Sequence, residues 1–257
     1  MVTKLEKIKF KINNTCMNEC SFCQFNNNPE KLYVKDLNDF FNKISKNNFI
    51  KFRRIIINGG EPTIHPEFLD ISKYLKDRFE GNKIIQLGSN LKLFEISNKN
   101  TQKRLEAIFE TYQKVSIGCD DEHQNIDIVE KLIPEFYRRR IKININSING
   151  YYSNKTMHRL LNLKKKYGVN LMFSPLAHYW EDKPFLGNPG LCRDRRRDFL
   201  VNCNGDAFFC YQQELMKPVF NIHCIDQKVL NYYLFEYIPS KKYNFCMNCE
   251  KFIKDEH

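Results

Sequence analysis

Two patterns of apolar and polar residues, the alternation typical of strands and the spacing typical of helices, recur over the first 175 residues of the chain. Ile8, Phe10 and Ile12 alternate with lysines, a spacing typical of a strand with one polar face. Apolar residues at helical spacing follow, and the two patterns then repeat along the chain. The predicted strands are 8–12, 55–57, 83–87, 115–117, 141–145 and 169–173, and the predicted helices are 36–44, 66–78, 100–112, 124–139 and 155–167.

Alternating strands and helices predict an α/β fold with a parallel sheet and right-handed crossovers. Six such βα units can curl into a partial (β/α)6 barrel, in which functional residues follow the carboxyl ends of the strands. Pro134 is expected to kink or divide the fourth helix. Asn144 and Asn146 alternate with isoleucines, so we expect them to face the lumen.

The pattern changes after a Gly- and Pro-rich stretch at 183–190, which predicts a boundary between residues 1–185 and a smaller region, 186–257. Apolar segments at 199–201 and 207–209 flank Asn202-Cys-Asn-Gly-Asp206, which predicts a β-hairpin. A short helix is expected at 229–237. The second region is therefore a small domain made of a hairpin and a helix.

Composition restricts the location and the partners. No apolar segment approaches the length of a membrane span and the N-terminus lacks the apolar core of a signal peptide, so we expect a cytoplasmic protein without a membrane partner. The net charge is +11. Four basic runs contribute to it, of which 138–140 and 164–166 suit helix C-termini and 193–197 lies beside Cys192, and we do not expect nucleic-acid binding. The four runs are 51–54, 138–140, 164–166 and 193–197.

Three cysteines, Cys16, Cys20 and Cys23, lie on one short segment directly after the first predicted strand. A closed metal site usually takes four protein ligands, so three thiolates suggest a cluster with one open iron. With Phe22 before the last cysteine, the segment resembles that of the radical S-adenosylmethionine (SAM) enzymes. The resemblance implies a [4Fe–4S] cluster whose open iron is chelated by SAM, and reductive release of a 5′-deoxyadenosyl radical. A partial zinc site is the alternative.

Further motifs support this resemblance. Gly59-Gly60-Glu61-Pro62 follows the second strand and matches the family's contact to the SAM amino group. Ser89 and Asn90 follow the third strand, where relatives carry Thr-Asn-Gly and contact the SAM ribose or carboxylate. Asp120 follows the fourth strand, with Gly118 where relatives carry Ser, and could instead cap a helix. The resemblance also makes Asn144 and Asn146 candidate SAM or substrate contacts.

A second group of cysteines lies after residue 190. Without a secretory segment, they favour metal binding over disulfides. Their spacing resembles the SPASM or Twitch domain, in its shorter form with one auxiliary [4Fe–4S] cluster. The resemblance implies four ligands and leaves Cys203 and Cys224 spare, with structural zinc as the alternative. The implied ligands are Cys192, Cys210, Cys246 and Cys249.

The layout resembles the aminocyclitol dehydrogenase of butirosin biosynthesis, which implies oxidation of a polar small molecule. The auxiliary cluster would accept one electron, and an external donor such as flavodoxin or ferredoxin would reduce the first cluster. Arg193 is a candidate for binding an anionic substrate. The sequence leaves three alternatives open: a peptide-modifying enzyme that forms a thioether or carbon–carbon crosslink, a radical epimerase in which a cysteine such as Cys119 donates hydrogen, and a non-enzymatic metal-binding module.

Overall fold

The computed structural model describes residues 3–23, 29–46, 50–174, 198–208, 218 and 220–226. Strands and helices alternate through residue 174, which confirms the α/β fold. The strands are β1 (Thr3–Lys11), β2 (Ile50–Asn58), β3 (Ile84–Ser89), β4 (Lys114–Gly118), β5 (Lys142–Ile148) and β6 (Asn170–Ser174). The helices are α1 (Val34–Ser45), α2 (Phe68–Phe79), α3 (Lys99–Thr111), α4 (Ile126–Arg138) and α5 (Asn154–Tyr167), with short 3₁₀ turns η1 (Pro62–Ile64) and η2 (Lys92–Glu95).

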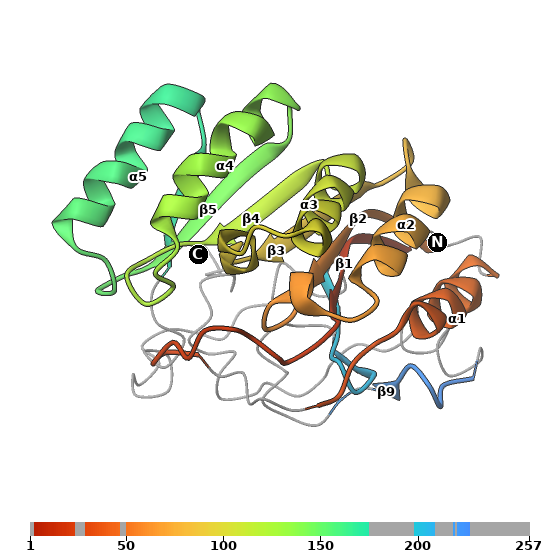
Figure 1. Cartoon of the computed structure of the whole chain (residues 1–257). Coiled ribbons are helices and arrows are strands. Elements are labelled where there is room, and N and C mark those ends of the chain that lie inside the picture. Colours follow the sequence, from red (N-terminus) through yellow and green to blue (C-terminus); the bar gives the residue numbers. More distant parts are fainter. Residues whose placement is uncertain are drawn as a thin grey trace, which may run out of the picture.

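The six strands form one parallel sheet in the order β6-β5-β4-β3-β2-β1. Figure 1 shows the five helices side by side along one face of this sheet. A parallel sheet whose crossover helices all lie on one face is the arrangement of a partial barrel. The carboxyl ends of the strands therefore meet at one edge, where the loops that follow β1 to β4 lie together.

The alternation of side chains along the strands explains the two faces. Ile55, Ile85, Val115 and Ile145 are buried in the hydrophobic core beneath the helices. Their sequence neighbours point to the other face, which is polar in the middle of the sheet, since Gln86 donates a hydrogen bond to Ser116 at 2.9 Å. This period of two was the signal that predicted the strands at 8–12 and 141–145, whereas the strand at 55–57 was predicted from a continuous apolar run.

A hairpin extends the sheet beyond β1. Strand β7 (Asp198–Val201) pairs in parallel with β1, and β8 (Asp206–Phe208) and β9 (Phe220–Asn221) continue antiparallel. The predicted hairpin is thus confirmed. Its turn needs Gly205, whose φ is +85° and where a Cβ would lie 2.4 Å from the His223 ring. Phe199 stacks on Phe40 of α1 at 5.7 Å, so the hairpin shares the core of the barrel.

Pro134 lies inside α4 without dividing it. Proline has no backbone N–H, so the carbonyl of Glu130 lacks its helical donor. Apolar residues on both sides of Pro134, among them Val129 and Phe136, are fully buried against the sheet. Packing of this face holds the helix together across the missing hydrogen bond.

Several predictions of the sequence fall on residues that the structure does not describe. These are the boundary at 185/186, the helix at 229–237, the four C-terminal ligands Cys192, Cys210, Cys246 and Cys249, and Arg193. In the part of the chain that is described, no helix is both long enough and apolar enough to cross a membrane.

Candidate functional site

The segment that leads to the cysteines lies against Gly59-Gly-Glu-Pro62. The backbone N–H of Gly60 donates to the carbonyl of Asn13 at 3.0 Å, and that of Glu61 donates to Thr15 at 2.8 Å. The Asn13 side chain in turn donates a hydrogen bond from Nδ2 to the carbonyl of Glu61 at 3.1 Å. These bonds continue the β1–β2 pairing past the strand ends, so the two motifs are held together by backbone.

The two glycines are required by this pairing. A Cβ at Gly59 would lie 2.4 Å from the carbonyl oxygen of Asn13, and one at Gly60 would lie 2.4 Å from that of Thr15. Neither distance is sterically possible. The sequence suggested that these glycines allow close approach to a ligand, whereas the structure shows close approach between two segments of the chain.

Glu61 is fully buried and its carboxylate is already surrounded by donors. Oε1 accepts hydrogen bonds from the Thr63 amide at 3.0 Å, the Thr63 hydroxyl at 2.6 Å and the Ser89 hydroxyl at 2.8 Å. Oε2 accepts from the Asn90 amide at 2.7 Å. Burial raises the pKa of this carboxyl, while these donors act to lower it. The side chain therefore ties the end of β2 to the end of β3.

Asn90 links the loop after β3 to the cysteines. Its Nδ2 lies 3.5 Å from Sγ of Cys16, and its Oδ1 accepts a bond from the Lys92 amide. The next residue, Leu91, is fully buried with φ +60°. Relatives carry glycine at this place, which suits such a φ. Here a buried leucine accepts the left-handed backbone and packs in the core.

The three cysteines are held on a loop whose thiols interact. The Cys23 amide donates to the Cys20 carbonyl at 2.9 Å, and the Asn18 amide lies 3.4 Å from Sγ of Cys16. Burial, followed by the charge of Asp120 and the other two thiols, raises the pKa of Cys20 to about 12. Burial also raises the pKa of Cys16. Thiolates form here only where a bound cation offsets these costs.

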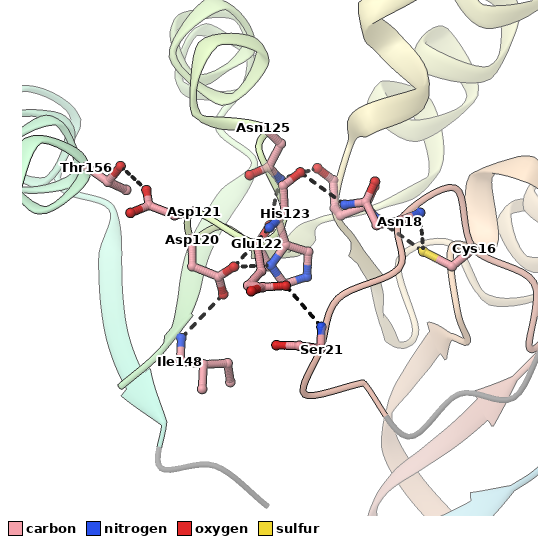
Figure 2. A network of polar contacts seen from close by, with 12 residues as sticks. Cys16, Asn18, Ser21, Asp120, Asp121, Glu122, His123, Asn125, Ile148 and Thr156 are labelled. Carbon is pink, nitrogen blue, oxygen red and sulfur yellow. Dashed lines mark hydrogen bonds and ion pairs between the residues drawn. The ribbon is translucent and has the colours of Figure 1, made fainter. Parts of the chain in front are cut away.

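Asp120 is buried in the loop between β4 and α4 (Figure 2). Its Oδ1 accepts from the amide of His123 at 3.0 Å and lies 2.8 Å from the ring Nδ1 of the same residue. It does not cap α4, which begins after Asn125. The His123 ring takes the space above Gly118, where a Cβ would lie 3.0 Å from Nε2. This explains glycine in place of the family's serine.

Glu122 and His123 of the same loop, which were not among the residues predicted from the sequence, contact the cysteine segment. Asn18 donates from Nδ2 to the carbonyl of His123 at 3.0 Å, and the Ser21 amide donates to Oε2 of Glu122 at 3.0 Å. Phe22 packs between His123 and Tyr151, with ring centroids 5.6 and 4.9 Å away. Their position directly after a predicted strand was the signal that could have identified Glu122 and His123.

Asn144 and Asn146 are placed differently. Both alternate with the buried Ile143 and Ile145, as expected, and so point to the other face of the sheet. Asn146 pairs in register with Gly118 at the end of β4, and its buried Oδ1 has no hydrogen-bond partner. Asn144 lies towards the start of β5, where its Oδ1 accepts a bond from Asn170 at 3.4 Å. The structure thus places Asn146 near the carboxyl end of the sheet, where the other predicted SAM contacts lie, whereas Asn144 lies away from them.

The donor set fits a cluster better than a single ion. Among the described residues, no three His, Cys, Asp or Glu side chains converge to hold one metal ion. In a [4Fe–4S] cluster each thiolate binds a different iron, so the sulfurs need not converge on one point. Cys16, Cys20 and Cys23 would hold three irons, and the Gly-Gly-Glu-Pro segment is joined to the backbone that directly precedes them.

Solved structures share this fold. The structure of Streptococcus suis SuiB bound to the precursor peptide SuiA matches with a TM-score of 0.68 and 14% identity, over 96% of this chain and 71% of that one. Native anSMEcpe with bound AdoMet and the Cp18Cys peptide matches with 0.63 and 15%, over 96% and 86%. BtrN in complex with AdoMet and 2-DOIA matches with 0.53 and 13%, over 92% and 89%.

A sequence comparison with curated proteins finds no match. The family described as the Radical SAM superfamily matches residues 10–167, which run from the end of β1 to the end of α5 and include the cysteine segment and the Gly-Gly-Glu-Pro motif. The match covers more than half of the chain. With the cysteine loop and its neighbours in place at the carboxyl edge, the chain belongs to the radical SAM superfamily, whose members use SAM with a [4Fe–4S] cluster.

Proposed function

We propose that this radical SAM enzyme is an oxidoreductase that removes two electrons from a polar small molecule. The joining of the three-cysteine loop to the Gly-Gly-Glu-Pro segment by backbone hydrogen bonds at the strand ends supports the radical SAM part of this proposal. When bound, SAM and the cluster supply a radical that takes a hydrogen atom from a substrate C–H bond. One electron and one proton must then leave the substrate to complete the oxidation.

The described residues provide positioning. Asn90, Asp120 and Asn146 lie at or near the carboxyl ends of β3, β4 and β5, where a barrel binds its ligands. Glu61 fixes the loops after β2 and β3 relative to each other. These residues would orient SAM and substrate, so that the reacting atoms meet in one geometry.

We further propose that a second [4Fe–4S] cluster accepts the remaining electron. Its ligands would be Cys192, Cys210, Cys246 and Cys249, all outside the described residues, with Arg193 beside the first of them. A cluster with four cysteine ligands has no open iron, so its natural role is electron transfer. The hairpin that precedes Cys210 lies on the sheet beside β1, the strand from which the first cysteine loop leaves.

Counting iron tests the second cluster. The Cys16/Cys20/Cys23→Ala triple variant removes the first site, and we expect about four irons to remain after anaerobic reconstitution. Zinc in their place would establish a structural metal, and no metal at all would remove the proposed electron acceptor. Either result would overturn the auxiliary cluster without affecting the first site.

A peptide-modifying reaction is the second candidate. Two of the matched structures, SuiB and anSMEcpe, were solved with bound peptides. Deuterium at the reacting carbon passes to 5′-deoxyadenosine in both reactions, so the product separates them: oxidation of a small molecule yields a ketone or aldehyde. A crosslinked peptide would instead show a new thioether or carbon–carbon bond by fragmentation mass spectrometry.

The epimerase alternative lacks support at Cys119. That residue is fully buried within the hydrophobic core, and burial raises the pKa of its thiol to about 12. A hydrogen donor must touch the substrate radical, and the Cys119 side chain is enclosed in the hydrophobic core.

A further inference from the structure

The cysteine segment is fastened to the β4–α4 loop at a point between Cys20 and Cys23. The amide of Ser21 donates to Oε2 of Glu122 at 3.0 Å (Figure 2). Phe22 packs its ring against His123, with the ring centroids 5.6 Å apart. Ser21 is the residue directly after Cys20. The side chain of Glu122 thus reaches across from a different strand end, 101 residues further along the chain, to hold the backbone beside a cluster ligand.

The β4–α4 loop that carries Glu122 is itself well fixed. Asp120 accepts bonds from His123 on Oδ1 and from the Ile148 amide on Oδ2, the latter at 3.5 Å. On the other side, Asp121 accepts from the Ser153 amide and from the Thr156 hydroxyl at the start of α5. Asp120 and Asp121 thus fix the residues before Glu122, and the bond between His123 and Asp120 fixes the residue after it, so Glu122 is presented to the cysteine segment from an anchored loop.

Glu122 also brings a negative charge close to Cys20. Its Oε2 lies 3.0 Å from the amide nitrogen of Ser21, the residue that follows Cys20, and the buried Asp120 lies two residues before Glu122 in the same loop. Reduction of an iron–sulfur cluster adds an electron to the same place, so fixed negative charge beside the ligands makes reduction harder. Partial burial of the pair limits screening by solvent.

We propose that Glu122 is a positioning residue for the cysteine loop and that its charge lowers the reduction potential of the cluster held there. A low potential makes the reduced cluster a stronger donor to SAM. The inference rests on the radical SAM cluster alone, and holds whether the substrate is oxidised, crosslinked or epimerised. It adds to this chain a residue that the family's motifs do not contain.

Two substitutions separate the two roles. Glu122→Gln keeps a side-chain oxygen that can accept from Ser21 but removes the charge, whereas Glu122→Ala removes both. Glu110→Gln is the control, because it removes the same charge from an exposed residue near the end of α3, ion-paired with Lys76 at 3.1 Å. Thermal unfolding verifies that each variant is folded.

Two quantities are measured. The first is the iron content after anaerobic reconstitution. The second is the midpoint potential of the cluster, measured by electron paramagnetic resonance on the signal that changes when SAM is added. We expect Glu122→Gln to keep wild-type iron and a SAM-dependent signal with a more positive potential. Glu122→Ala should load less iron, and Glu110→Gln should match wild type in both.

An unchanged potential in Glu122→Gln, or a shift equal to that of Glu110→Gln, would overturn the electrostatic role. Full iron loading with an unaltered SAM-dependent signal in Glu122→Ala would overturn the positioning role. Failure of the proposed oxidation would leave these signals intact, because they report on the first cluster and not on the product.

Discussion

At the scale of single residues, the close contact between Gly60 and Thr15 is the most sensitive feature of the site. Gly60→Ala would place a methyl group 2.4 Å from the Thr15 carbonyl and force apart the segment that leads to the cysteines. We expect destabilisation of about 1–3 kcal/mol and a loss of cluster loading, measured by chemical denaturation and iron content.

Gly150→Ala is the matched control for that substitution. Gly150 has φ +87° and open space around its Cβ position, so alanine there should cost about 1–2 kcal/mol of backbone strain without any effect on iron loading. Normal loading in Gly60→Ala, or an equal loss of iron in both variants, would contradict the structural role assigned to the glycine pair.

His65 makes the stability of the fold depend on pH. It is fully buried next to the motif, and burial, together with Lys31 and Arg104, lowers its pKa from 6.5 to about 4. Below pH 6.5 the unfolded chain therefore takes up a proton that the folded chain does not, so stability falls as the pH falls towards 4. The loss approaches about 3 kcal/mol at the lower limit.

Melting temperatures measured between pH 7 and about 5, where part of this loss is expected, test the assignment. We expect His65→Gln to flatten the decline seen in wild type, because glutamine does not titrate. His158→Gln, at an exposed position on α5, should leave the decline unchanged. A slope in His65→Gln equal to that of wild type would show that other groups cause the pH dependence.

At the scale of elements, the sequence predicted the described strands and helices of the barrel well. Each has a recognisable pattern of apolar residues, which is a short continuous run, an alternation, or a helical spacing. The isoleucines of β2 and β5 and the amphipathic face of α4 are examples. Element ends were less predictable. Strand β2 begins at Ile50, well before the apolar run at Ile55, because pairing with β1 extends the strand past its hydrophobic residues.

The candidate site was predictable only in part. Cys16, Glu61 and Asn90 stand in recognisable motifs, but the bonds among them depend on loops that meet only in the folded chain. Glu122 stands 101 residues from its partner Ser21, and spacing alone cannot relate two such positions. The role of Glu61 as a tie between loops likewise became visible only through its four donors.

Pro134 gives a test at the scale of one helix. Pro134→Ala restores the donor to the carbonyl of Glu130 within a helix whose apolar face is already packed. We expect stabilisation of up to about 3 kcal/mol, measured as a higher denaturation midpoint with an unchanged slope. A lower midpoint would show that the helix bends at Pro134 and that the core is fitted to the bend.

At the scale of the whole molecule, one sheet joins the barrel strands to the hairpin. Strand β1 lies between β2 and β7, so the strand that leads into the cysteine loop is held on both sides. Phe40 of α1 covers both β1 and β7 through contacts with Phe10 and Phe199. The hairpin strands β7 and β8 therefore fold with the barrel rather than apart from it.

We expect the loop holding Cys16, Cys20 and Cys23 to support reductive cleavage of SAM. The most direct measurement is the amount of 5′-deoxyadenosine and methionine formed when the anaerobically reconstituted, chemically reduced protein is incubated with SAM. We predict that both products form with wild-type protein and that neither forms with the Cys16/Cys20/Cys23→Ala variant. Absence of cleavage by wild-type protein with a verified, reduced cluster would contradict the account.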